Sequence, residues 1–77
     1  MKKQPVSHAR LLMDMPAERF RVISPNGRAP RAGDIVELDQ GFNGPDGLPM
    51  ALVYFSDPGG GYMYVAEVYE SELGDSI

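Results

Sequence analysis

The residues that could perform chemistry are few and scattered. The chain contains no cysteine and a single histidine, His8. Without thiols there can be no thiol catalysis and no cysteine-based zinc or iron–sulfur site. His8 has no histidine or thiolate partner for a metal, and the acids Glu70 and Glu72 lie in an acidic stretch with no pocket signal that would shift a pKa. We therefore expect no catalytic residue, no metal and no cofactor, in a protein that is not an enzyme.

The tyrosines are the most informative side chains. All four lie between positions 54 and 69, and tyrosine is enriched at protein interfaces because it is large and amphipathic. We expect Tyr62 and Tyr69, with Glu67 between them, to form an exposed aromatic and acidic patch for a basic or proline-containing peptide. Ordinary cross-strand packing is the alternative. The candidate partner-binding residues are Tyr62, Glu67, Tyr69, Glu70, Phe42 and Asp46.

Charge is divided between the two parts of the chain. Residues 1–31 hold all seven cations and two acids, a net charge of +5, whereas residues 32–77 hold nine acids and no cation. Such asymmetry is consistent with a basic arm or an acidic binding surface, or with two halves that neutralise each other on folding. The candidate nucleic-acid contacts are Arg19, Arg21, Arg28 and Arg31, with Lys2, Lys3 and Arg10 in the same basic part.

Length and hydropathy limit the class of protein. A chain of 77 residues fits one small domain whose core is modest. Lys2 and Lys3 resemble the start of a signal peptide, but no apolar segment follows. No stretch approaches the roughly 20 apolar residues of a membrane span. We expect a cytoplasmic protein without membrane contact.

Alternating and continuous apolar runs predict a mainly β domain. The expected strands are residues 20–23, 34–38, 50–55 and 62–69, separated by glycine and proline turns. In the second strand Val36 and Leu38 should point inward, and in the last one Tyr64, Ala66 and Val68 should do so. The continuous run at 50–55 favours a central strand covered on both faces.

The two ends of the chain give weaker signals. Residues 1–9 are expected to be a loosely ordered tail, and residues 74–77 a second one, which leaves a single domain at 10–73. Residues 10–15 could form either a strand or a short helix that stops before Pro16. The expected architecture therefore has four to five antiparallel strands and at most one short helix near the N-terminus.

Residues 33–47 carry one family-like pattern. Gly33-Asp34 opens an apolar strand, and a loop with Gly41, Gly44 and Gly47 follows it. This pattern resembles the KOW-type segment of SH3-like barrels, and the resemblance implies a small SH3-like β-barrel. Many KOW-type domains bind RNA or ribosomal partners through basic loops. This segment contains acids and no cation after Gly33, which disfavours phosphate contacts.

Three functional hypotheses follow from these patterns. The first is a protein-binding module whose acidic, tyrosine-containing surface meets a partner with a basic surface. The second is a nucleic-acid-binding accessory domain that uses the basic N-terminal part, with affinity that falls as salt rises. The third is a structural homodimer formed through unpaired edge strands, so the chain is expected to be a monomer or a weak homodimer.

Overall fold

The protein is a single antiparallel β-sheet with two short turns of 3-10 helix. The computed structural model describes residues 7–76, so the predictions for residues 1–6 and for Ile77, including Lys2 and Lys3, lie outside the described residues. The strands are β1 (His8–Leu11), β2 (Phe20–Val22), β3 (Ile35–Asn43), β4 (Pro49–Ser56), β5 (Tyr62–Tyr69) and β6 (Leu73–Ser76). The helical turns are η1 (Ala17–Arg19) and η2 (Glu70–Glu72).

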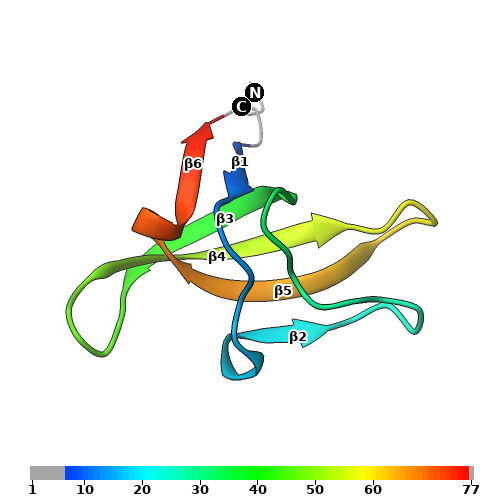
Figure 1. Cartoon of the computed structure of the whole chain (residues 1–77), viewed down its shortest axis with the longest axis horizontal. Helices are drawn as coiled ribbons and strands as arrows, with labels where there is room; N and C mark the ends of the chain where they lie inside the picture. The colour runs from blue at the N-terminus through cyan, green and yellow to red at the C-terminus, as the bar shows by residue number, and fades with distance from the viewer. Residues whose placement is uncertain (1–6, 77) are drawn as a thin grey trace, which may run out of the picture.

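The strand order across the sheet is β2-β5-β4-β3-β1-β6 (Figure 1). Every neighbouring pair is antiparallel, which confirms the mainly β, antiparallel prediction. The edge strands β2 and β6 do not pair with each other, so backbone hydrogen bonds do not close the sheet. The predicted count of four to five strands is wrong, because the described chain forms six.

The sequence did not predict strand β6, and both predicted tails were too long. Residues 74–76 belong to β6, and His8 and Ala9 belong to β1, so both predicted tails took in residues that pair. Glycine, aspartate and serine have low β-propensity. They form a strand here because β1 supplies the backbone partners of β6. Propensity alone therefore misses a strand that depends on a distant partner.

Three other local predictions also differ from the structure. The open choice at residues 10–15 resolves partly as strand, because β1 ends at Leu11. The short helical turn η1 follows Pro16 rather than preceding it, and η2 near the C-terminus was not predicted. Strand β3 continues to Asn43, although a loop was predicted from residue 40, because its backbone pairs with β4 as far as Pro49.

The strand faces agree with the sequence pattern where burial is strongest. Strand β5 has the predicted bounds, Tyr62–Tyr69, and its residues Tyr64, Ala66 and Val68 are buried in the core. Val36 is fully buried, and Leu38 is half-buried against the same core. The period of two therefore located the inner face of the sheet correctly.

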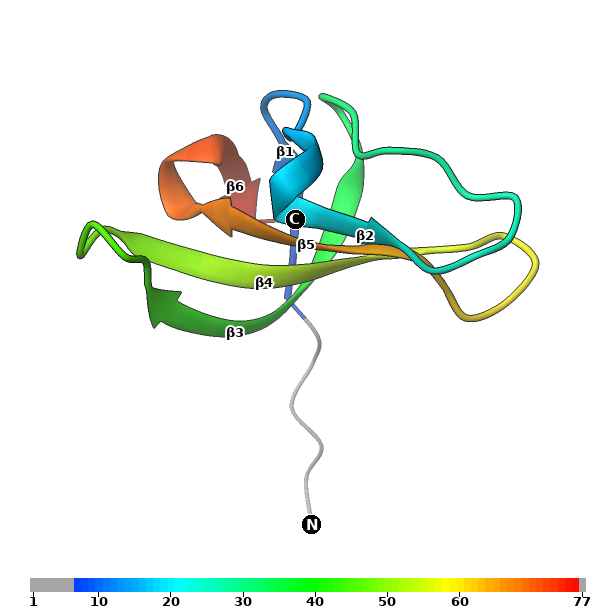
Figure 2. The ribbon, with the colours of Figure 1, turned by 90° about the horizontal axis from the view of Figure 1, so that it is seen from below.

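The rest of the described chain covers mainly one side of strands β3, β4 and β5. Figure 2 shows η1, β6 and the connection from residue 23 to residue 34 on that inner side. Within the described residues, no strand or helical turn lies over Leu52 and Tyr54 on the opposite side, whereas Met50, on that same side of β4, is buried next to Gly44 of the β3–β4 loop. The prediction that β4 is covered on both faces is wrong, because Leu52 and Tyr54 remain half-exposed.

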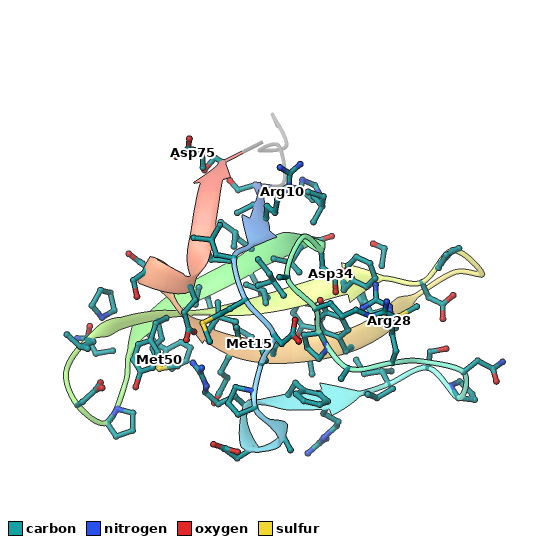
Figure 3. The ribbon with its side chains drawn as sticks, in the orientation of Figure 1. Arg10, Met15, Arg28, Asp34, Met50 and Asp75 are labelled. Atoms are coloured by element: carbon teal, nitrogen blue, oxygen red, sulfur yellow. The ribbon has the colours of Figure 1, made fainter. Side chains whose placement is uncertain are left out.

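A buried carboxylate holds the long connection between β2 and β3. Both Asp34 oxygens accept hydrogen bonds of 2.9 Å from the two terminal nitrogens of Arg28 (Figure 3). The hydroxyl of Tyr64 and the backbone N–H of Arg31 donate to Oδ2 at 2.8 and 3.0 Å. The Arg28 guanidinium also lies over the ring of Phe55, 5.1 Å from its centroid. A buried charge persists only when it is paired and hydrogen-bonded in this way.

The ionisation of this cluster follows from its contacts. Burial raises the pKa of the Asp34 carboxyl, but the hydrogen bonds from Arg28, Tyr64 and Arg31 outweigh burial and hold the pKa below its ordinary value. Burial and the bond to Asp34 raise the pKa of the Tyr64 hydroxyl far above its ordinary value. Tyr64 therefore remains a neutral donor to an ionised carboxylate.

A second ion pair links elements that belong to opposite edges of the sheet. Arg19, at the end of η1 before β2, donates two hydrogen bonds of 2.8 Å to Glu72, at the end of η2 before β6. Glu72 also accepts the backbone N–H of Tyr69. Like the pair of Arg28 with Asp34, this pair joins a cation of residues 1–31 to an acid of residues 32–77. The charge halves thus neutralise each other in part.

We expect removal of the buried carboxylate to destabilise the domain. Asp34→Ala leaves the Tyr64 hydroxyl and the Arg31 N–H without their acceptor, which should lower the free energy of unfolding by about 3 kcal/mol. Asp75→Ala, at an exposed position on β6, should change it by less than about 0.5 kcal/mol. Urea denaturation of both variants measures the difference. A loss below about 1 kcal/mol for Asp34→Ala would contradict this role.

Acid should weaken the fold because it protonates the carboxylates of Asp34 and Glu72. The pKa of Asp34 is lowered by its hydrogen bonds against burial, and that of Glu72 is lowered first by its hydrogen bond from Arg19. Their stabilisation is fully present above the pKa of the unfolded chain and is lost as pH falls through the folded pKa. The free energy of unfolding should therefore decline below about pH 5. In Asp34→Asn the decline, followed by urea denaturation at several pH values, should be shallower.

Candidate functional site

The uncovered side of the sheet brings together side chains from four strands. The register places Arg21, Val65, Tyr54 and Glu37 in one row across β2, β5, β4 and β3. The next row contains Glu67, Leu52 and Gln40. We call this side the outer face, defined by these seven residues together with Tyr62 and Asp39.

A bulge in β5 turns Tyr62 onto the outer face. In a regular strand, Tyr62 and Tyr64 would share a face because side chains alternate. Between the pairs Phe55–Tyr64 and Ser56–Tyr62, β5 contributes one extra residue, Met63. The bulge reverses the alternation, so Tyr64 stacks on Phe55 in the interior, whereas Tyr62 meets Tyr54 outside. The ring centroids of Tyr54 and Tyr62 are 4.8 Å apart at an interplanar angle of 43°.

A second bulge, in β3, aligns an acidic side chain with this pair of tyrosines. Asp39 is the extra residue between the pairs Leu38–Val53 and Gln40–Leu52. Leu38 thus faces the core, whereas Glu37 faces outward beside Tyr54. The hydroxyl of Tyr62 donates a hydrogen bond of 3.1 Å to Oε2 of Glu37. This bond is the main cause of a raised Tyr62 pKa, and the charge of Asp39 adds to it.

An open cavity adjoins the tyrosine pair on the β2 side. It has a volume of about 240 Å³. Leu52 and Val65 provide apolar surface, while Arg21 and Glu67 are exposed charged residues along it. Neither of these two charges is in an ion pair with another described residue. The remaining lining residues are Glu18, Arg19, Phe20 and Ala66.

The predicted partner-binding residues separate into two groups. Tyr62 (39% exposed) and Glu67 lie on the outer face. Tyr69 lies on the same side of β5 as Glu67. It is half-buried, donates a 2.8 Å hydrogen bond to Asp46, and has the Arg19 guanidinium 5.1 Å from its ring centroid. That bond raises the pKa of Tyr69 and lowers that of Asp46. Tyr69 is thus held by contacts within the domain.

The remaining two predicted residues lie away from the tyrosine pair. Phe42 is half-buried and pairs in register with Met50, which is buried and labelled in Figure 3. The backbone at Gly44 approaches Met50 so closely that a Cβ there would lie 2.7 Å from its sulfur. Glu70 is exposed in η2. The sequence therefore located part of the outer face and part of a structural contact.

The predicted nucleic-acid contacts do not form one group of free cations. Arg19 and Arg28 are in ion pairs with Glu72 and Asp34. Arg21 is exposed on the outer face, and Arg31 is exposed in the connection between β2 and β3. Arg10 is exposed on β1, and Figure 3 shows it apart from Arg28, towards the top of the view.

Sequence reasoning missed several residues of this face. Leu52 and Tyr54 alternate with the buried Ala51 and Val53. The sequence does not show which side of this strand is exposed, because all four side chains are largely apolar. Glu37 alternates with the inward-pointing Val36 and Leu38, but its place beside Tyr62 depends on the two bulges. The positions of such bulges could not be read from strand propensity.

Residues 7–76 contain no group of three histidine or acidic residues that could hold a metal ion. The same residues form no helix long and apolar enough to cross a membrane. Comparison of the chain with models of known protein families, with curated proteins and with solved structures found no match.

We expect Glu37→Gln to lower the pKa of Tyr62 towards its ordinary value. The neutral amide removes the charge that disfavours the phenolate while keeping an acceptor for the hydroxyl. Titration followed by the NMR shifts of the Tyr62 ring measures the change. Glu67→Gln is the matched control and should leave the titration of Tyr62 unchanged. Equal shifts in both variants would refute a specific contact between Glu37 and Tyr62.

Proposed function

We propose that this protein is a non-catalytic, SH3-like β-barrel module that binds a basic segment of a partner protein on its outer face. The observation that carries the proposal is the composition of that face. Tyrosine and aliphatic side chains lie side by side without cover from the described chain, and carboxylates flank them on β3 and β5. This combination suits an extended cationic peptide.

The SH3-like part of the proposal draws support from the curvature of the sheet. Strand β3 pairs with β1 through its first residues and with β4 through the rest, and the Asp39 bulge lies along it. Bulges bend a strand and increase its twist. The ion pair of Arg19 with Glu72 then connects the elements that precede the two edge strands. These features favour a barrel-like wrap that lacks a closing ladder of hydrogen bonds.

Charge favours a basic partner. Glu37, Asp39 and Glu67 belong to the outer face, whereas Arg21 is its one cation. Arg19 borders the cavity but is neutralised by Glu72. Attraction of a cationic segment by these carboxylates would raise the association rate and weaken with salt.

The tyrosines supply apolar contact area at low entropic cost. Tyr54 and Tyr62 hold each other in a tilted pair, and Tyr62 is further oriented by its bond to Glu37. Rigid tyrosines make good contact surfaces because few torsions are frozen on binding. Their rings can also accept cations from lysine or arginine.

We expect a lysine-containing peptide to bind the whole chain in a salt-dependent way. Glu67→Lys should weaken binding by about five- to tenfold, since it replaces an attraction with a repulsion next to the cavity. Asp75→Lys makes the same charge change on β6 and should have a smaller effect. Titration by NMR at low and physiological salt measures both affinities and the residues that shift.

Three outcomes would overturn the proposal. The first is no binding of the lysine-containing peptide at low salt. The second is equal weakening by Glu67→Lys and Asp75→Lys, which would indicate an effect of net charge alone. The third is binding of a single-stranded oligonucleotide in preference to the peptide, which would assign the basic part of the chain as the functional surface.

A further inference from the structure

We propose that the outer face contains two separate subsites for cationic side chains, and that their spacing selects the bound peptide. One subsite is the cavity beside Glu67, and the other is the group formed by Glu37, Asp39 and Tyr62. The expected ligand is an extended segment with two lysine or arginine residues four positions apart. This inference rests on the proposed function and adds a sequence requirement to it.

The cavity can receive one long cationic side chain. Its volume of about 240 Å³ is below the roughly 300–1,000 Å³ of typical small-molecule pockets. Leu52 and Val65 offer apolar surface to the methylene groups of lysine or arginine, which commonly pack on such surfaces while the charge stays in water. Glu18 and Glu67 are exposed acids of the lining that can approach the charged end.

The two arginines near this cavity do not prevent it from binding a cationic side chain. Arg19 gives both terminal nitrogens to Glu72 at 2.8 Å, so its charge is already compensated. Arg21 is exposed on β2, an edge strand of the sheet. With Arg19 and Glu72 cancelling, the lining retains two acids, Glu18 and Glu67, against the one cation Arg21. The balance favours a cation over an anion.

The second subsite has a different chemical character. Oε2 of Glu37 accepts one hydrogen bond from Tyr62, and a carboxylate has further acceptor positions on both oxygens. Asp39 is exposed on the bulge immediately after Leu38. The tyrosine pair borders this group, so a cation here would meet carboxylates and aromatic rings together.

The distance between the subsites follows from the sheet register. Glu67 aligns with Leu52, whereas Glu37 aligns with Tyr54, so the two acids are two strands apart and offset by two residues. Strands are separated by about 4.8 Å and rise about 3.3 Å per residue, so we expect about 12 Å between the two α-carbons. An extended peptide spans about 3.3–3.6 Å per residue, which corresponds to three or four positions, and only a separation of four directs both side chains to the same side of the peptide.

Tyr54 lies between the two subsites, so it limits which separations of two cations in a peptide can fit both. It aligns with Val65 of the cavity on one side and with Glu37 on the other. A peptide that places one cation in each subsite must therefore cross the Tyr54 ring. Two adjacent lysines project to opposite sides of an extended peptide, so they cannot both be directed at the sheet.

The test compares peptides of equal charge that differ only in spacing. Capped glycine–serine peptides carry two lysines that are adjacent, three positions apart or four positions apart, and each is titrated into the full chain at low salt. We expect the peptide whose lysines are four positions apart to bind about two- to fivefold more tightly than the other two, the range of one additional exposed ion pair. Glu37→Gln and Glu67→Gln should each remove this preference, whereas Asp75→Asn, on β6, should retain it.

The outcomes separate this inference from the proposed function. Equal affinity of the wild-type chain for all three peptides would overturn the two-subsite inference while leaving a general basic-peptide module. Absence of binding to every peptide would overturn both. A spacing preference that survives both glutamine variants would overturn the assignment of the subsites. The comparison of peptides on the wild-type chain needs no variant, so it does not depend on how the variants fold.

Discussion

The fold depends on the satisfaction of one buried carboxylate. Asp34 receives four hydrogen bonds, from Arg28, Tyr64 and the backbone of Arg31. These contacts, together with the fully buried Pro30, fasten the connection between β2 and β3 to the core residue Tyr64 on β5. Phe55 joins the same assembly through its stack on Tyr64 and its contact with the Arg28 guanidinium. A polar network thus adds to apolar packing in holding this connection on the core.

The covered inner face has a direct consequence for the outer one. The described chain packs its connections and helical turns on the inner side, with Leu11 and Met15 contributing to the core there. Few residues remain to cover the other side of β3, β4 and β5. Two bulges then decide which side chains occupy it. They turn Tyr62 towards Tyr54 and Glu37 towards both, so backbone irregularity rather than composition assembles the candidate site.

The division of charge along the chain has both structural and surface effects. Both ion pairs of the described residues join a basic residue of the N-terminal part to an acid of the C-terminal part. The acids left without such partners include Glu37, Asp39 and Glu67 on the outer face. The two charged parts of the chain can therefore partly neutralise each other and still leave an acidic surface, because the acids in the ion pairs are not the acids of the outer face. The arginines expected to contact nucleic acid are divided in the same way between structure and surface.

The sequence by itself determined the β class, the bounds of β5 and the inward positions of Val36, Tyr64, Ala66 and Val68, because side-chain alternation and turn residues are local signals. It also indicated Tyr62 and Glu67 as surface candidates. Only the tertiary structure decided the strand β6, the bulges at Asp39 and Met63, and the pairing of Arg28 with Asp34. These features depend on partners distant in the chain or on a register shift between strands, and local residue propensities predict neither of them.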